Sequence, residues 1–235
     1  MSRRSDLDRL YDLLDRLEAN VGGKQRLKDC TGYMDWPERG VYFFFAGDET
    51  RDLTDQLRLT RVGTHAVSSG SGTSLWNRLR THRGANRGTY EGGGNHRGSV
   101  FRKRVGEAMI ERDGLHGEYL HWGNGSSAGR ERRLSELEHE RSVSEYIRDL
   151  PFLWVDVDDE PSPESDRAYI ERNAIALLSN YRKDSLDPRD DWLGHDSPRS
   201  EISDSGLWNI NHIGERYDPT FLDRLADAVE ETSDL

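Results

Sequence analysis

The chain has 235 residues, enough for one to one-and-a-half domains with a hydrophobic core that needs no disulfides or structural metals. Hydrophobic and charged residues each make up 33%, so the chain is very polar, yet six Trp, nine Tyr and six Phe exclude a disordered protein. The longest apolar run, 41–46, is far shorter than the ~18 residues of a membrane helix, and the N-terminus has no signal-peptide pattern. A lone cysteine, Cys30, excludes an intramolecular disulfide and a cysteine-ligated zinc site. We expect a soluble, cytoplasmic protein that contacts no membrane.

Charge is distributed unevenly along the chain. The net charge is −11, which disfavours a nucleic-acid partner because phosphates repel an acidic surface. Residues 51–110, however, contain 11 Lys and Arg against four Asp and Glu, a local net charge of +7. This asymmetry favours a basic working surface set in an acidic body, although charges clustered on an ordinary solvated surface would give the same count.

The first half of the chain predicts both helices and strands. Leucines at helical spacing indicate a helix over 7–21, with Ser5 as its N-cap and Gly22-Gly23 as its end. Aromatic and β-branched residues predict a buried strand over 41–46. The next predicted elements are an antiparallel strand at 57–65, a helix at 75–83 between glycine-rich loops at 68–74 and 84–98, and a helix at 99–109.

The second half alternates in the same way. Residues 134–147 give a mixed pattern, and residues 152–158 predict a confident strand. Pro161 and Pro163 then precede a helix that runs to Leu178, and a last helix covers about 219–229.

The order of these elements favours an α+β fold with a small three-stranded antiparallel sheet flanked by helices. No internal repeat and no clear linker divides the chain. We distinguish an N-terminal helical segment packed on the core (1–39), a core domain (40–183) and a C-terminal extension with the terminal helix (184–235).

Several short motifs are weak by themselves. The loop from Gly70 to Ser74 lacks the lysine of a phosphate-binding loop, and neither glycine-rich loop has dinucleotide-binding spacing. Asn211-His212 faintly resembles an HNH-type metal nuclease, but the surrounding pattern is missing, so we interpret it as a coincidence. None of five histidines has metalloprotease spacing, and taken singly each is more typical of a structural or surface position: His65, His82, His96, His195 and His212.

A set of residues between positions 40 and 180 is more informative when taken in order. Gly40-Val41-Tyr42 lies on the first predicted strand and Arg61-Val62-Gly63 on the second; Arg78 and His82 follow one turn apart on a helix. Glu171 then precedes an apolar stretch on the helix after the third strand. The chain therefore resembles the GIY-YIG endonuclease family, in which Gly-Ile-Tyr, Tyr-Ile-Gly, an Arg/His helix and a glutamate helix occur in this order.

This resemblance implies a metal-dependent endonuclease that hydrolyses phosphodiester bonds of DNA, with RNA as an open alternative. Glu171 would hold one Mg²⁺ or Mn²⁺ ion through oxygen, and Arg78 would contact phosphate oxygens. Tyr42 would stand near the attacking water as base or proton relay, with His82 on the same helix face as Arg78. The plainer interpretations are a core tyrosine, an exposed helix face and, for Glu171, an ordinary charged helix position.

The chain departs from the family pattern in ways that bear on mechanism. Arg61 replaces the second tyrosine; we expect it to support catalysis by favouring the ionised form of Tyr42, since a phenol is a poor base at neutral pH. The family's asparagine after the glutamate has no clear counterpart, because Asn180 lies closer to Glu171 than expected. His96 is expected as an additional catalytic histidine.

Five cations are expected to follow the phosphate backbone of the substrate: Arg80, Arg83, Arg97, Arg102 and Lys103. Two other function classes stay open. The missing second tyrosine would suit a nucleic-acid-binding module that has lost turnover, and the net acidity would suit a protein-interaction domain. The sequence predicts neither the target nor the oligomeric state.

Overall fold

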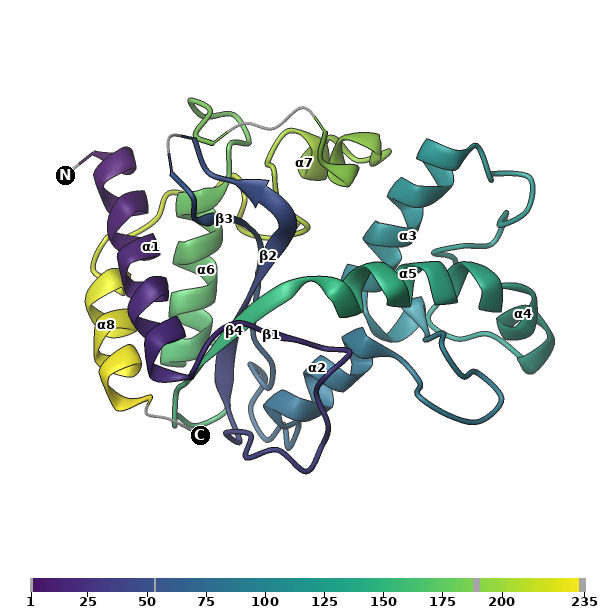
Figure 1. The fold of residues 1–235 in the computed structure, drawn as a ribbon, viewed down its shortest axis with the longest axis horizontal. Coiled ribbons are helices and arrows are strands. Elements are labelled where there is room, and N and C mark those ends of the chain that lie inside the picture. Colours follow the sequence, from purple (N-terminus) through teal and green to yellow (C-terminus); the bar gives the residue numbers. More distant parts are fainter. Residues whose placement is uncertain (1, 53, 188–190, 233–235) are drawn as a thin grey trace.

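The computed structural model describes residues 2–52, 54–187 and 191–232. Within them, one antiparallel sheet has its strands in the order β1, β4, β2, β3 (Figure 1). The strands are β1 (Gln25–Arg26), β2 (Gly40–Thr50), β3 (Leu57–Gly63) and β4 (Pro151–Asp156). The α+β class is confirmed, but the sheet has four strands rather than the three predicted. The additional strand, β1, has two residues, which is too short to produce a periodic pattern.

Helices cover both faces of the sheet. The helices α1 (Arg3–Asn20), α6 (Asp166–Leu178) and α8 (Phe221–Glu231) lie on one face, and α2 (Leu75–Arg83), α3 (Val100–Asp113) and α5 (Leu137–Asp149) lie on the other (Figure 1). Shorter elements are α4 (Arg130–Ser135), α7 (Ser200–Ser203) and the 3-10 turns η1 (His96–Gly98) and η2 (Leu193–Asp196). No helix in the described part of the chain is long and apolar enough to span a bilayer.

Serine side chains cap several helices. Ser2, not the predicted Ser5, caps α1, because the Ser5 backbone N–H donates to Ser2 Oγ at 3.2 Å. The first turn of α1 is polar, so the leucine periodicity begins only at Leu7 and hides the true start. The mixed pattern at 134–147 corresponds to α4 and α5, which meet at Glu136.

The alternation of side chains along β2 divides the interior into two clusters. Val41, Phe43 and Phe45 point towards α1, α6 and α8, where they pack on leucines and isoleucines; we call this the apolar face. Tyr42 and Phe44 point towards α2, α3 and α5, where Phe101, Phe152, Trp154 and Trp208 gather; we call this the aromatic face. Both sides of β2 are therefore buried, as the uninterrupted apolar run predicts.

The C-terminal region is part of the same core. The Trp208 backbone N–H donates to Thr60 O at 2.8 Å, and the Asn209 side chain both accepts from and donates to the Val62 backbone, at 3.1 and 2.8 Å. These contacts cover the outer edge of β3, which would otherwise present unpaired backbone groups. Helix α8 packs on α1 and α6, so parts of the first and third predicted segments share one hydrophobic cluster. The division into three segments stays a prediction.

Candidate active site

The two glycines of the strand motifs occupy positions where a side chain has no room. Tyr42 on β2 is paired with Gly63 on β3, and a Cβ atom on Gly63 would lie 2.3 Å from the Tyr42 hydroxyl oxygen. A Cβ atom on Gly40 would lie 2.4 Å from the Val155 carbonyl oxygen. Close approach of the phenol to β3, and of β4 to β2, thus explains why this pattern uses glycine.

Behind Tyr42 lies a buried chain of hydrogen bonds. The Tyr42 hydroxyl is 2.9 Å from His82 Nε2, and His82 Nδ1 is 2.8 Å from Ser99 Oγ. Burial, followed by the Arg78, Arg61 and Arg102 cations, lowers the pKa of His82 well below 6.5, so the ring is neutral. A neutral ring that accepts from Tyr42 carries its proton at Nδ1 and donates it to Ser99. The hydroxyl of Ser99, the N-cap of α3, therefore selects which nitrogen of His82 faces the tyrosine.

Two arginines from different elements lie beside this pair. Arg78 comes from α2, and its pKa is raised by charge interaction and a hydrogen bond with Tyr42 and by the charge of Glu171, which together outweigh burial. Arg61 comes from β3; it donates to Trp208 O at 3.2 Å and lies 4.8 Å above the Phe101 ring. Within the part of the chain that the structure describes, the Nε atoms of both arginines are buried without a hydrogen-bond partner. Buried donors without partners are costly unless a ligand satisfies them, and an oxyanion would do so.

Glu171 approaches the arginines from the opposite face of the sheet, past the end of β3. Its Oε1 accepts from the Thr64 backbone N–H at 3.2 Å, while the Thr64 hydroxyl donates to Gly40 O at 2.8 Å. Burial raises the pKa of Glu171, against the lowering effects of Arg61, Thr64 N–H, His212 and Arg78. The half-buried carboxylate lines a groove of about 580 Å³ that also contains Tyr169, Arg172 and His212.

The carboxylate of Glu171 suits one hard divalent cation. Its Oε1 accepts from the Thr64 backbone N–H, and the groove leaves space around the carboxylate for waters and a phosphate. No group of three or more His, Cys, Asp or Glu side chains able to hold a metal occurs in residues 2–52, 54–187 and 191–232. A site here would therefore follow the Mg²⁺ and Mn²⁺ pattern of few protein ligands completed by water and substrate.

The structure brings four predicted site residues together with Arg61, but it does not expose all of them. Tyr42 and His82 are fully buried, whereas Arg78 and Glu171 are half-buried. The prediction that Tyr42 stands beside an attacking water therefore does not fit this arrangement, because Gly63, His82 and Arg78 surround the hydroxyl. A relay or positioning role, acting through Arg78, is compatible with its burial.

These positions agree with a match at the level of the whole sequence. The family model of the GIY-YIG domain matches residues 1–235. The chain belongs to the GIY-YIG domain family. No curated protein and no solved structure matches the chain. The family generally comprises endonucleases, so its general function is that of a nuclease acting on nucleic acid.

Two of the expected backbone-contacting cations are internal in this GIY-YIG domain. Arg102 is fully buried; it binds the Glu140 carboxylate at 2.5 and 3.1 Å and donates to His82 O at 2.8 Å. The guanidinium of Arg97 is held by both oxygens of Glu136, at 2.6 and 2.8 Å, and its side chain is 1% exposed. Both predictions of a phosphate contact are wrong, because each charge is neutralised inside the protein.

The other three predicted cations differ in exposure. Arg83 is buried, donates to Cys30 O at 2.7 Å and lies over the Trp76 ring, so it also does not fit a surface contact. Lys103 is partly buried and donates to Gly123 O. Arg80 is exposed on α2, two residues after Arg78. Among these five cations, Arg80 is therefore the best placed to contact a phosphate.

His96 does not belong to the Tyr42–Glu171 site. Its Nδ1 is 3.0 Å from Glu140 Oε1, its Nε2 accepts from the Gly123 backbone N–H at 3.1 Å, and its ring stacks on Trp122. Both nitrogens are thus engaged in a fully buried network between η1 and α5. The expectation of a catalytic His96 is not supported by this position, because neither nitrogen is available to a substrate.

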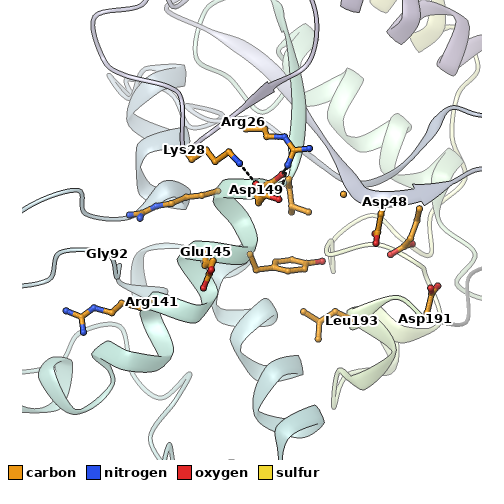
Figure 2. Close-up of a pocket in the computed structure, with 14 residues that line it drawn as sticks. Arg26, Lys28, Asp48, Gly92, Arg141, Glu145, Asp149, Asp191 and Leu193 are labelled. Atoms are coloured by element: carbon orange, nitrogen blue, oxygen red, sulfur yellow. Dashed lines mark hydrogen bonds and ion pairs between the residues drawn. The ribbon is translucent and has the colours of Figure 1, made fainter.

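A larger cavity lies elsewhere in the GIY-YIG domain. It has a volume of about 1040 Å³ and none of the predicted site residues lines it. Figure 2 shows Arg26 and Lys28 bound to Asp149 on one side, and Asp48 and Asp191 on the other. Charges of both signs line it, so its walls define no preference for a phosphate. Cavity size alone therefore does not identify the candidate site.

Two C-terminal residues of the site region escaped sequence reasoning. Asn209 fixes β3 through Val62, and His212 lines the groove of Glu171. The sequence has no clear counterpart of the family's asparagine after Glu171, and no recognisable motif surrounds Asn211-His212. The useful signal is polar residues within an apolar stretch around Trp208, which indicates a segment that returns to the core.

Proposed function

We propose that this GIY-YIG domain is a divalent-metal-dependent endonuclease that hydrolyses phosphodiester bonds of DNA. The observation that carries the proposal is the convergence of Tyr42, His82, Arg78 and Glu171, from β2, α2 and α6, at the end of β3. Arg61 joins them from β3 itself. These residues supply a cationic phosphate site, a carboxylate and a buried Tyr–His pair within one region.

The arginines would bind the scissile phosphate. Arg78 and Arg61 each have a buried Nε–H that has no acceptor among residues 2–52, 54–187 and 191–232, and both lie near Glu171. Phosphodiester hydrolysis builds negative charge on the phosphate oxygens in the transition state, which fixed cationic donors stabilise. Arg61, at the position of the family's second tyrosine, would thus bind the phosphate directly.

Glu171 would hold Mg²⁺ or Mn²⁺ through its carboxylate. When bound, such an ion neutralises phosphate charge and favours hydroxide over water as the nucleophile. The Thr64 N–H keeps one Glu171 oxygen in place, and burial raises the pKa of this carboxyl group.

Tyr42 and His82 would position Arg78 from behind as a buried hydrogen-bonded pair. The neutral His82 ring accepts a hydrogen bond from the phenol at Nε2, over 2.9 Å, while Ser99 accepts from Nδ1. In the arrangement described, the phenol also holds Arg78 through its oxygen. This assignment needs no direct contact between Tyr42 and water.

A second candidate is a nucleic-acid-binding module of the same fold without turnover. Two observations favour it: Arg61 stands in place of the second tyrosine, and Tyr42 is fully buried. Such a module would bind DNA through phosphate contacts, with affinity that falls as salt rises, and would cut under no divalent ion.

The deciding experiment is cleavage of supercoiled plasmid by the purified full chain with Mg²⁺ or Mn²⁺. We expect Glu171→Gln to reduce the rate by roughly 10²-fold or more, the effect of removing one group that stabilises transition-state charge. Glu164→Gln, in the same groove, is the matched control and should retain activity. Equal cutting by wild type and Glu171→Gln would overturn the proposed site. Salt-sensitive binding without nicking would favour the binding module. Labelled DNA and RNA of the same sequence distinguish the substrates.

A further inference from the structure

His212 is held in the Glu171 groove by the segment that covers β3. Asn209 is bonded to Val62, and Ile213 is buried in the apolar face, so the backbone on both sides of His212 is anchored. His212 itself has φ of 66°, a left-handed conformation that is uncommon for a residue with a side chain. Such strain persists only where surrounding contacts impose it, and it occurs preferentially at functional sites.

The imidazole of His212 is oriented by a carboxylate. Nδ1 lies 2.7 Å from Glu215 Oε1, and the other Glu215 oxygen lies 3.5 Å from the Arg172 guanidinium. Because a carboxylate only accepts, Nδ1 carries the proton, and the neutral ring has its lone pair on Nε2. A histidine whose other nitrogen donates to a carboxylate is the usual arrangement of a metal-ligating histidine.

His212 and Glu171 line the same groove, although 40 residues separate them in the chain. The His212 side chain is 32% exposed, so its ring is accessible from the groove. His212 is near enough to Glu171 to interact with its carboxylate electrostatically. Arg61 and Arg78 also act on that carboxylate and repel a bare cation, so a metal there gains from a further donor besides Glu171.

We propose that His212 Nε2 is a second protein ligand to the divalent cation at Glu171, oriented by Glu215, and that it biases the site towards Mn²⁺ over Mg²⁺. This inference rests on the proposed function, in which Glu171 holds the cation. Imidazole nitrogen is a better ligand for Mn²⁺ than for Mg²⁺, which prefers oxygen. The C-terminal extension would thereby contribute a side chain to the same site as the residues of the two strand motifs.

Binding of Mn²⁺ alone to the full chain tests this without any cleavage assay. Electron spin-echo spectroscopy of bound Mn²⁺ should show coupling to a histidine nitrogen in wild type and no such coupling in His212→Gln. Titration calorimetry should show Mn²⁺ affinity lowered by about 10–100-fold in Glu215→Gln, the usual cost of removing the partner of a metal-bound histidine. Mg²⁺ affinity should change less. His121→Gln, an exposed histidine outside the groove, is the control and should match wild type.

The outcomes separate this inference from the function on which it rests. Absence of nitrogen coupling in wild type, or its persistence in His212→Gln, would overturn the role of His212 even if Glu171→Gln abolishes Mn²⁺ binding. Mn²⁺ binding that survives Glu171→Gln unchanged would overturn both the metal role of Glu171 and this inference. Thermal melts of each variant confirm that the fold is retained, and absence of nitrogen coupling in wild type overturns the inference independently of any variant.

Discussion

The two faces of the sheet are built from different chemistry. The apolar face holds leucines and isoleucines of α1, α6 and α8 around Val41, Phe43 and Phe45. The aromatic face combines Phe and Trp rings with a buried polar network of His82, Ser99, Arg102, Glu140 and His96. Tyr42, Arg61 and His82 of the candidate site belong to this second face. The apolar face therefore stabilises the fold by burial alone, whereas the aromatic face also carries buried polar groups, among them three residues of the candidate site.

The physical cost of the two faces differs accordingly. Apolar burial stabilises in proportion to area and needs no orientation, about 25 cal/mol per Å². Buried polar groups stabilise only when each has a partner, because an unpartnered one costs about 1–3 kcal/mol. Substitutions on the apolar face should therefore lower stability by creating cavities, to the same extent at any pH. Substitutions on the aromatic face should lower stability by removing hydrogen-bond or charge partners, to an extent that depends on pH.

The largest expected loss of stability comes from breaking the ion pair between Glu140 and Arg102, at the centre of the buried polar network. Although burial by itself raises the pKa of Glu140, hydrogen bonds and charges from His96 and Arg102 lower it to about 2 from its ordinary 4.5. Glu140→Gln should cost about 3–5 kcal/mol at pH 7, because it leaves Arg102 buried without its counter-charge. Urea unfolding at pH 7 measures this loss.

The pH dependence of the same variant follows from the direction of the shift. A carboxyl with a lowered pKa contributes stability above its unfolded pKa and loses it as pH falls from 4.5 towards 2. Wild type should lose this contribution in that range, and Glu140→Gln should not. A free energy of unfolding that falls equally in both proteins would contradict the role of Glu140.

A leucine on the apolar face gives the contrasting case. Leu10 on α1 is fully buried, and Leu10→Ala should cost about 2–5 kcal/mol through lost burial and a cavity. The cost should be the same at pH 7 and pH 4, since no charge is involved. If the cost depends on pH, the distinction between the two faces is wrong.

A smaller effect is expected where the faces meet at the strand motif. Gly63→Ala places a Cβ atom 2.3 Å from the Tyr42 phenol, so that ring must move, at a cost of about 1–3 kcal/mol. The variant should also lose plasmid nicking, because Tyr42 holds Arg78 and His82. Gly72→Ala, which has open space and no positive φ, is the matched control and should alter neither stability nor nicking.

The smallest effect concerns the orientation of His82. Ser99→Ala removes the N-cap of α3, at about 1 kcal/mol, and also removes the hydrogen-bond partner of His82 Nδ1. Nitrogen NMR of the imidazole should show a changed tautomer balance in Ser99→Ala and the wild-type balance in Ser99→Thr. Ser165→Ala, which removes the N-cap of α6, should cost similar stability and leave the His82 signals unchanged. An unchanged tautomer in Ser99→Ala would refute this role.

Much of the fold and part of the site were predictable from local patterns. The apolar run at 41–46, the helix at 75–83 and the Arg78–His82 spacing all follow from residues close in sequence, and the structure has them as β2 and α2. The ordered motif predicts the helix that carries Glu171, and the role of Glu171 in the site stays a prediction. The two-residue strand β1 was not predicted, because it exists only through its pairing with β4.

Charges were the hardest to predict. The cations at 97 and 102 were counted as surface charge, but their carboxylate partners, Glu136 and Glu140, lie about 40 residues further along the chain. No local pattern reveals such a pairing. His96 was misassigned for the same reason, since Glu140 and the Gly123 backbone take up its nitrogens.

Local sequence patterns predicted most helices and strands in their order and the burial of the strand at 41–46, because backbone preference and hydrophobic period depend on neighbouring residues. Three features follow only from the way the chain folds in space. Particular arginines are neutralised inside the protein, Glu171 comes close to Arg61 and Arg78, and His212 returns to the same groove. Those outcomes depend on which distant side chains find one another, and electrostatic partnership acts over distance in space rather than along the chain.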